Sequence, residues 1–317
     1  MKFFLITGAA GFIGYHLCKS LLEDGYEIIG IDNLNDYYDR NLKNTRLKNL
    51  MNYNNFKFEN ADISDFDSIA KIFKTFKPVK VINLAAQAGV RYSIKNPNVY
   101  MQSNLVGFFN MIELCRYNEV RGFIYASSSS VYGGNEKIPF TISDKIQKPV
   151  SLYGATKAAN ELIAHSYSQL YNLHTTGLRY FTVYGPWGRP DMAIFIFTKK
   201  IIANEPIPIY NFGKMKRDFT YIDDIVSGII SSLYKNYEYE IFNLGNNKYV
   251  ELMDVVSKIE KGLNKKAQIE FLPMQPGDVE KSNADISKSI DLLGFKPLTE
   301  IDEGINNLVD WYKNYYN

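Results

Sequence analysis

Short apolar runs alternate with helical patterns from the start of the chain to about residue 180. Apolar or alternating segments at 3–6, 28–31, 56–59, 79–84, 122–126 and 175–180 predict strands. Between them, apolar residues recur at helical spacing and predict helices over 12–22, 41–50, 69–76, 97–118 and 152–171. Strands that alternate with helices favour a parallel sheet whose right-handed crossovers place helices on both faces. The pattern therefore predicts an α/β fold with a doubly wound parallel sheet.

The rhythm of the pattern changes after Phe181. Glycines and prolines cluster at 185–190, and shorter elements follow, including a strand at 208–210 and a helix at 252–263. We expect a sheet domain over 1–181, which also uses part of 218–245, and a smaller mixed α/β lobe over 182–317. Asp223-Asp224 reads either as a catalytic carboxylate pair or as a helix N-cap, and the N-cap is favoured because aspartate is common there.

The turn after the first strand has the spacing Gly8-x-x-Gly11-x-x-Gly14. It joins a buried strand to a helix N-terminus, where backbone N–H groups and the helix dipole favour an anion. Glycines at such a turn let the backbone approach a pyrophosphate closely. A tight structural turn would explain the same three glycines, since the spacing differs from the usual Gly-x-Gly-x-x-Gly.

Asp32 adds a second feature, because it ends the second predicted strand eighteen residues after Gly14. An acid at roughly this distance accepts hydrogen bonds from the adenosine ribose of a dinucleotide. Its charge would also repel a 2′-phosphate. Together the turn and the acid predict a site for NAD rather than NADP.

Tyr153 and Lys157 are four residues apart on a predicted helix, so they share one face of it. A neighbouring ammonium favours the phenolate and is expected to lower the tyrosine pKa, as would a nicotinamide cation. Tyr153 would then serve as a general base near neutral pH. The helix follows a serine run, 127–130, whose hydroxyls are suited to bind a substrate oxygen. The same spacing is also common on ordinary amphipathic helices.

Composition excludes several other classes. The chain has 317 residues and a net charge of +2, which gives no electrostatic case for nucleic acid or an anionic membrane. No apolar segment approaches the roughly 20 residues of a membrane span. Two cysteines, Cys18 and Cys115, suggest a reducing cytoplasm, and three scattered histidines have no metal-ligand spacing. We therefore expect a cytoplasmic protein without a metal site.

Taken jointly, these motifs resemble the NAD-dependent epimerase/dehydratase family, the extended short-chain dehydrogenases. The resemblance covers almost the whole chain and rests on the glycine turn, Asp32, Asp62, Leu84-Ala85-Ala86, Asn104, the serine run, Tyr153/Lys157, Arg179-Tyr180-Phe181 and Arg217-Asp218-Phe219. It implies a Rossmann-like fold and a catalytic triad of Ser128, Tyr153 and Lys157. It also implies NAD contacts from Gly8, Gly11, Phe12, Ile13, Gly14, Asp32, Asn33, Asp62, Ile63, Leu84, Ala85, Ala86, Asn104, Tyr153, Lys157 and Tyr180.

Substrates in this family are usually nucleotide sugars. The resemblance implies that Arg217 and Asp278 hold the diphosphate and nucleoside ribose, and that Ile209 and Tyr210 lie near the uracil. Many relatives carry an arginine three residues before Asp278, where this chain has Gln275.

The serine run narrows the reaction. Family dehydratases carry an Asp-Glu pair after the catalytic serine or threonine, and decarboxylases usually keep a glutamate before the valine. This chain has Ser129 and Ser130 at those positions, which leaves epimerisation and makes both serines substrate-binding candidates.

The segments around Arg91 and Arg189 resemble UDP-glucuronate 4-epimerases, as does Thr182 after Tyr180-Phe181. Arg91, Thr182 and Arg189 would face the sugar carboxylate, since a guanidinium fork suits a carboxylate. An inter-lobe or surface ion pair is the competing interpretation for both arginines.

The leading hypothesis is a UDP-glucuronate 4-epimerase. The alternatives are a UDP-glucose or UDP-N-acetylglucosamine 4-epimerase and, from a different class, a non-catalytic NAD-binding protein. The family resemblance also implies a homodimer packed through the helices predicted at 97–118 and 152–171.

Overall fold

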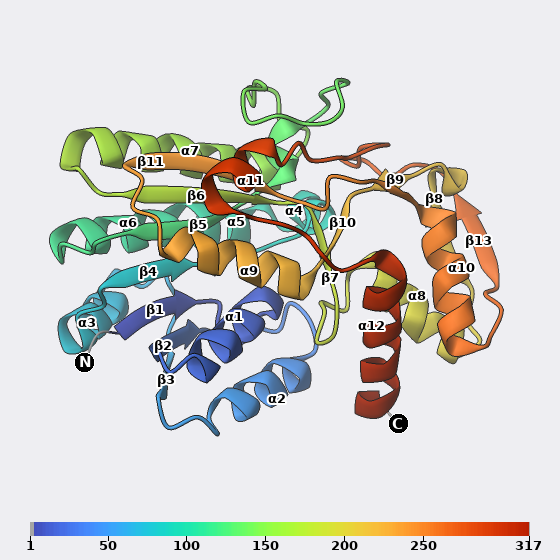
Figure 1. Cartoon of the computed structure of the whole chain (residues 1–317), viewed down its shortest axis with the longest axis horizontal. Coiled ribbons are helices and arrows are strands. Elements are labelled where there is room, and N and C mark those ends of the chain that lie inside the picture. Colours follow the sequence, from blue (N-terminus) through green and yellow to red (C-terminus); the bar gives the residue numbers. More distant parts are fainter. Residues whose placement is uncertain (1–2, 317) are drawn as a thin grey trace.

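A seven-stranded parallel sheet forms the centre of the protein in a computed structural model that describes residues 3–316 (Figure 1). The strand order is β11-β6-β5-β4-β1-β2-β3, and every neighbouring pair is parallel. Their bounds are β1 Phe3–Thr7, β2 Glu27–Asp32, β3 Phe56–Asn60, β4 Lys80–Asn83, β5 Phe123–Ser128, β6 Thr175–Tyr180 and β11 Tyr239–Leu244. The predicted doubly wound sheet is confirmed. One of its two edge strands, β11, comes from far along the chain.

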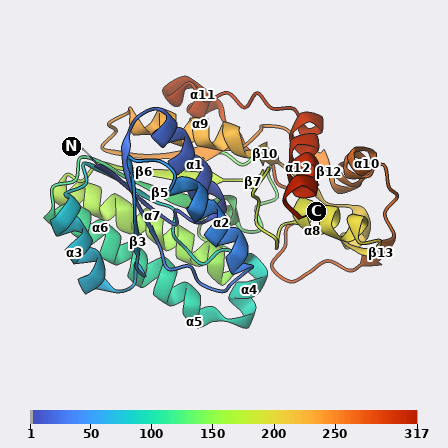
Figure 2. The same cartoon turned by 90° about the horizontal axis from the view of Figure 1, so that it is seen from below.

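Helices cover both faces of the sheet (Figure 2). One face carries α1 (Phe12–Glu23) and α9 (Ile222–Leu233), and the other carries α3 (Phe66–Phe76), α6 (Gly107–Tyr117) and α7 (Leu152–Tyr171). Two hydrophobic cores follow from this arrangement, one containing Leu21 and Ile229 and the other containing Phe73 and Met111. The sheet is therefore buried on both sides, which explains why its strands read as continuous apolar runs.

The helix predicted over 97–118 has three parts. Residues Pro97–Tyr100 form α5, Met101–Val106 wind as a π-helix, η1, and Gly107–Tyr117 form α6. Single π-helical turns are rare and concentrate at functional sites. Asn104 lies within this turn and is 1% exposed, so the turn directs its amide into the protein.

The second lobe lies beside the carboxyl ends of the strands, at the right of Figure 1. It contains α8 (Ala193–Ile202), α10 (Leu252–Leu263), α12 (Ile301–Tyr316) and the parallel pair β8 (Ile207–Tyr210) and β13 (Ile269–Leu272). Two short ladders connect it to the sheet domain: β7 (Thr182–Tyr184) with β10 (Phe219–Tyr221), and β9 (Lys216–Arg217) with β12 (Val250–Glu251). The remaining helices are α2 (Arg40–Leu50), α4 (Val90–Lys95) and α11 (Ser287–Leu293).

The predicted N-cap role of Asp223 or Asp224 is wrong. The N-cap of α9 is Tyr221, and both aspartates lie in the first helical turn. The Asp224 carboxylate instead accepts hydrogen bonds from the backbone N–H groups of Leu298 and Thr299, at 2.9 and 3.2 Å. A long-range contact to the segment before α12 thus replaces the expected local cap.

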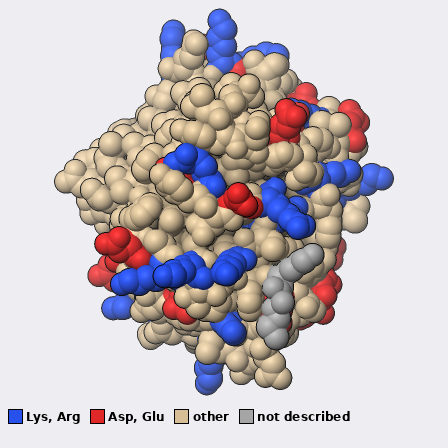
Figure 3. Space-filling view, turned by 90° about the vertical axis from the view of Figure 1, so that its left-hand side faces the viewer, with Lys and Arg blue, Asp and Glu red and all other residues tan. Residues whose placement is uncertain are grey.

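The surface carries charges of both signs. In the face shown by Figure 3, lysine and arginine side chains are interspersed with acidic ones among broad uncharged areas. Within residues 3–316, no helix is both long and apolar enough to cross a membrane. Cys18 and Cys115 are buried free thiols.

Candidate active site

The glycine turn between β1 and α1 is closed by its own backbone. Gly8 has a φ of 71°, a conformation that favours glycine, and the Gly11 N–H donates to the Gly8 carbonyl at 2.9 Å. A Cβ built on Gly14 would lie 2.0 Å from the Gly8 oxygen, so a larger residue would push the helix away from the turn. The three glycines are therefore required for the approach of α1 to the strand end.

Asp32 lies at the carboxyl end of β2 and is 9% exposed. Its carboxylate accepts hydrogen bonds from the backbone N–H of Ala10 in the glycine turn, at 3.1 Å, and of Leu34, at 2.9 Å. Burial raises the pKa of Asp32, while the Leu34 hydrogen bond, the Lys43 charge and the Ala10 hydrogen bond oppose the rise. Each carboxylate oxygen keeps a lone pair for a further donor, such as a ribose hydroxyl.

Neighbouring strand ends are joined by side-chain hydrogen bonds. Asn33 donates to Asp62 at 2.7 Å, and Asp62 also accepts from Ser64. Thr7 accepts from the Ala85 N–H, which fixes the loop after β4.

Asn104 acts deeper in the protein than the predicted NAD contact suggests. Its amide accepts from the N–H of Gln87 at 2.8 Å and donates to the carbonyl of Gln87 and the hydroxyl of Thr156. Asn104 therefore links the loop after β4 to helix α7.

The three predicted catalytic residues come together at the ends of β5 and α7. Ser128 ends β5 and is 8% exposed, and Ser129 and Ser130 follow in a 3-10 turn. The N-cap of helix α7 is Ser151, whose side chain accepts from the Gly154 N–H at 3.0 Å. This cap fixes the start of the helix at Leu152, directly before Tyr153.

The pKa of Tyr153 departs from the sequence-based expectation. Burial raises it above the ordinary value, while a hydrogen bond with the Ser128 side chain and the charge of Arg189 oppose the rise. The expectation of a lowered pKa is thus wrong for the polypeptide by itself, because desolvation of the phenolate outweighs the nearby positive charge.

Lys157 is held by a hydrogen bond to strand β5. Its ammonium donates to the carbonyl of Ala126 on β5 at 2.7 Å. Burial lowers its pKa to about 8, and the negative charge of Glu161 opposes that fall. Lys157 is still mostly protonated at neutral pH and supplies positive charge one helical turn from Tyr153.

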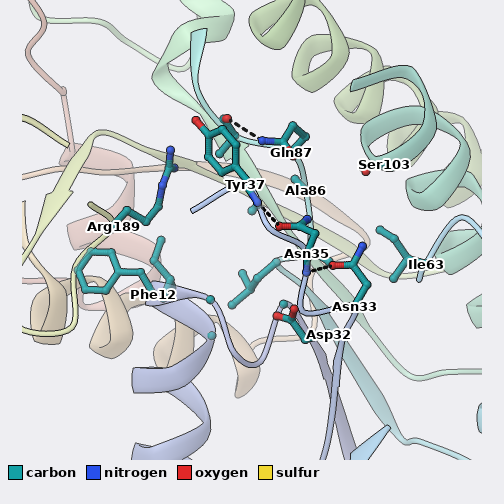
Figure 4. Close-up of a pocket in the computed structure, with 18 of the residues that line it drawn as sticks. Phe12, Asp32, Asn33, Asn35, Tyr37, Ile63, Ala86, Gln87, Ser103 and Arg189 are labelled. Carbon is teal, nitrogen blue, oxygen red and sulfur yellow. Dashed lines mark hydrogen bonds between the residues drawn. The ribbon is translucent and has the colours of Figure 1, made fainter. Parts of the chain in front are cut away.

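A single cavity is lined by both the glycine turn and these three residues. Figure 4 shows part of its wall, with Asp32 and Arg189 on it. Most predicted NAD contacts line it: Gly8, Gly11, Phe12, Ile13, Gly14, Asp32, Asn33, Asp62, Ile63, Leu84, Ala85, Ala86, Tyr153, Lys157 and Tyr180. The predicted catalytic Ser128 and the predicted substrate residue Arg189 line it as well. The cavity therefore runs from a dinucleotide-type turn to a Ser-Tyr-Lys set.

Arg189 reaches this cavity while paired with Asp191. Its Nε and Nη2 donate to the two carboxylate oxygens at 3.0 and 2.5 Å, and Tyr37 donates to the same carboxylate at 3.0 Å. Burial would lower the pKa of Arg189, but the charge and hydrogen bonds of Asp191, together with Tyr37 and Tyr153, outweigh it and raise the pKa. The Arg189 pair thus lies within its own loop rather than between the lobes, and Arg189 also lines the cavity.

Arg91 lies with the predicted uridine and diphosphate residues. Its Nη1 donates to the Gln275 side chain at 2.5 Å, and its guanidinium lies 5.9 Å from the ring centroid of Tyr210. The charges of both Asp278 and Arg91 act on the partly buried Arg217 guanidinium, whose pKa is lowered chiefly by desolvation. These contacts join Arg91, Tyr210, Arg217, Gln275 and Asp278 into one group on the second lobe and α4.

Two other predicted substrate residues, Ile209 and Thr182, do not line the cavity. Ile209 has no exposed surface and belongs to the lobe core, whereas its neighbour Tyr210 is partly exposed. Thr182 begins β7 and its backbone N–H donates to the Asp218 carbonyl at 3.0 Å.

Several cavity residues were not predicted from the sequence. Asn35, Tyr37, Tyr38, Lys43, Gln87, Ser103, Val183 and Met192 also line it. Tyr37 and Tyr38 belong to the polar stretch after Asp32. Their position directly beyond a candidate ribose-binding acid could have identified them as cavity residues.

The cavity fits NAD. The glycine turn brings backbone N–H groups to the strand ends, and Asp32 keeps acceptor capacity beside it. The buried hydroxyl of Tyr180 has no hydrogen-bond partner within residues 3–316 and lies on the cavity wall, where a bound ligand would satisfy it. No cluster of three or more His, Cys, Asp or Glu suited to a metal occurs in the same range.

Comparisons with known proteins agree with this geometry. The model of the "NAD dependent epimerase/dehydratase family" matches residues 4–245. Protein CapI of Staphylococcus aureus is 50% identical, with 98% of each chain covered. A probable UDP-glucuronate 4-epimerase of Rhizobium meliloti is 43% identical, with 99% of this chain and 97% of the relative covered.

Among solved structures, the UDP-glucuronic acid 4-epimerase of Bacillus cereus in complex with UDP-glucuronic acid and NAD superposes with a TM-score of 0.94. It is 36% identical, and the match covers 99% of this chain and all of that one. With a family model that spans three quarters of the sequence and a glycine turn, acid and Ser-Tyr-Lys set in one cavity, the chain belongs to the NAD dependent epimerase/dehydratase family.

Proposed function

We propose that the protein is an isomerase that converts UDP-glucuronate to UDP-galacturonate by NAD-dependent epimerisation at C4. The observation that carries this proposal is that Arg189 lines the same cavity as Ser128, Tyr153 and Lys157. Arg189 is suited to bind a sugar carboxylate, and the Ser-Tyr-Lys set is suited to remove a hydroxyl proton. Both line one cavity. Relatives that bear the name UDP-glucuronate 4-epimerase cover nearly the whole chain, which supports the same substrate.

The chain's own residues divide the work. NAD, when bound, supplies the reversible hydride acceptor for the sugar C4. The glycine turn and Asp32 would hold the pyrophosphate and adenosine ribose. Tyr153 would take the proton of the 4-hydroxyl and later return it, and Ser128 would hydrogen-bond the same oxygen. Lys157 would keep a positive charge beneath Tyr153 and favour its phenolate, which burial alone disfavours.

Epimerisation requires the sugar to present both faces of C4 in turn while the rest of the nucleotide stays bound. The group formed by Arg91, Tyr210, Arg217, Gln275 and Asp278 offers positive charge and an aromatic ring for the uridine diphosphate. Binding energy from this remote part holds the nucleotide while the keto sugar turns. No net oxidation occurs, so the cofactor stays with the protein through turnover.

The test is a panel of UDP-sugars incubated with purified protein without added NAD, with products identified by NMR. UDP-galacturonate should form from UDP-glucuronate. Formation of UDP-galactose or UDP-N-acetylgalactosamine at equal rates would favour the general hexose epimerase. Absence of any product from a protein that retains NAD would instead favour a non-catalytic NAD-binding protein.

We further infer a homodimer that packs through α6 and α7. These helices lie side by side on the same face of the sheet (Figure 2). They expose large apolar side chains: Phe109 is 46%, Leu162 67% and Leu170 70% exposed. Soluble monomers rarely leave such residues together at the surface. Light scattering should show a dimer for the wild type. The Leu162→Lys variant should shift towards the monomer.

A cytoplasmic location is part of the same proposal. The buried thiols of Cys18 and Cys115 are unpaired, as is usual in a reducing compartment. Fractionation of the source cells with an antibody to the protein tests it.

A further inference from the structure

Arg46, in the middle of α2, is completely buried although it carries a charge. Its Nη1 donates to the Ala10 carbonyl in the glycine turn at 2.9 Å and to the Tyr38 hydroxyl at 2.7 Å. Its Nη2 donates to the carbonyls of Trp187 at 2.6 Å and Gly188 at 3.2 Å. All of these acceptors are neutral oxygens. The Asp32 carboxylate feels the Arg46 charge but accepts no hydrogen bond from it. A buried cation whose hydrogen bonds all go to neutral groups is costly, and nothing in the proposed chemistry uses Arg46.

The carbonyls that Nη2 holds directly precede Arg189 in the chain. Trp187 has a φ of 58°, which is uncommon and unfavourable for a residue with a bulky side chain. The Trp187 ring packs against Tyr15 of α1 and Trp311 of α12, at centroid distances of 5.5 and 5.3 Å. The loop over 185–191 is therefore held in an unfavourable backbone conformation by its surroundings.

The other end of this loop is held from the same region. Tyr37, which precedes α2, donates to Asp191, and Asp191 pairs with Arg189. Figure 4 shows Tyr37, on the loop that follows Asp32, beside Arg189 on the cavity wall. The segment over 37–46 thus touches the loop on both sides of Arg189, and Arg46 also contacts the cofactor turn.

We infer that Arg46 is a positioning residue that fixes the loop carrying Arg189 to the glycine turn, and that it sets selectivity for a sugar carboxylate without touching the sugar. The inference rests on the proposed function, since it names a determinant of the same site. It follows that loosening Arg46 should harm recognition of the acid sugar more than recognition of the neutral one.

The experiment compares kcat/KM for UDP-glucuronate and UDP-glucose in the wild type, Arg46→Lys, Arg189→Ala and the double variant, with NAD added in excess. Lysine keeps the charge but cannot span the acceptors on both sides. Losing one hydrogen bond from a charged donor changes an equilibrium by roughly tenfold. The ratio of kcat/KM for UDP-glucuronate to kcat/KM for UDP-glucose should therefore fall by roughly tenfold in Arg46→Lys. In the double variant the ratio should equal that of Arg189→Ala alone, because both changes act through one side chain.

Hydrogen exchange provides a readout that does not depend on the substrate. The amides over 185–191 should exchange faster in Arg46→Lys than in the wild type. Phe73→Leu, in the core on the opposite face of the sheet, is the control for general destabilisation, and it should leave both the ratio and the loop exchange unchanged. If Arg46→Lys does not fold, Tyr37→Phe takes its place and should shift both readouts in the same direction by less.

The outcomes separate the inference from the proposed function. Equal loss for both sugars, additive effects in the double variant or unchanged exchange of the loop would each overturn the role of Arg46. A wild type that does not distinguish the two sugars would overturn the proposed substrate, while loop exchange would still decide whether Arg46 holds the loop.

Discussion

Arg189 and Asp191 form a two-pronged ion pair on the wall of the cavity, with Nε–Oδ1 and Nη2–Oδ2 distances of 3.0 and 2.5 Å. The pair fixes the plane of the guanidinium before any substrate arrives. It also balances the Arg189 charge, so that a sugar carboxylate must share the arginine with Asp191.

Arg189→Ala should narrow the preference for UDP-glucuronate over UDP-glucose. A sugar carboxylate can share the Arg189 guanidinium with Asp191, whereas a hydroxymethyl group brings no charge to it. One hydrogen bond to a charged group contributes about 1.5–3 kcal/mol, or at least about tenfold in rate. The variant should lose most activity with the acid sugar and little with the neutral one. Steady-state kinetics with both sugars measure this, and an equal slowing of both would contradict the role of Arg189.

Tyr153→Phe should retain the fold and the bound NAD and lose turnover. Removing a general base typically lowers the rate ~10²–10⁴-fold. Cofactor content after purification and the rate of UDP-galacturonate formation are the two measurements. Retention of near-normal turnover would remove Tyr153 from the mechanism.

Asp32→Ala should weaken NAD binding and reduce discrimination against NADP, because the carboxylate lies at the strand end and its charge repels a 2′-phosphate. Calorimetric titration of cofactor-free protein with each dinucleotide tests this. The matched variant Asp32→Asn removes the charge and keeps the size. If the unchanged protein binds both dinucleotides equally well, the assignment of Asp32 is wrong.

Arg91→Met should raise KM for UDP-glucuronate and UDP-glucose by the same factor. The Arg91 side chain contacts Gln275 and lies over Tyr210, so its charge is placed for the diphosphate common to both substrates. The control is Gln275→Ala, which should have a smaller effect because it removes no charge. A selective loss with the acid sugar would instead favour the original prediction that Arg91 faces the sugar carboxylate.

Lys157 should make stability depend on pH above about 8. Its pKa is about 8 in the folded protein, below the ordinary value of 10.5, so the unfolded chain binds more protons between these limits. Its contribution to the free energy of unfolding therefore increases with pH in this window, by at most about 1.4 kcal/mol per pH unit. Urea unfolding from pH 7 to 10 should show this increase in the wild type and in the surface variant Lys199→Met. If the same increase persisted in Lys157→Met, Lys157 would not be the group responsible for it.

Local features of the sequence predicted the scaffold closely. Helix α7 runs from Leu152 to Tyr171 and strand β6 from Thr175 to Tyr180, as expected from apolar periodicity alone. Both ends of α7 are set by adjacent residues, a Ser151 cap and a left-handed Asn172. The glycine turn and Asp32 were also recognisable, because a dinucleotide-type turn needs only residues near one another in the chain.

Tertiary structure decided the properties that depend on distant residues. Arg46 meets Trp187, which is 141 positions away, and Arg91 meets Gln275, which is 184 positions away. Neither contact leaves a periodicity or motif in the sequence. The same holds for the raised pKa of Tyr153: the spacing to Lys157 is local, but the burial that outweighs it comes from elements gathered from the whole chain. Sequence determined which groups are present at the site, whereas folding determined their solvation and their partners, because desolvation and charge pairing act through space.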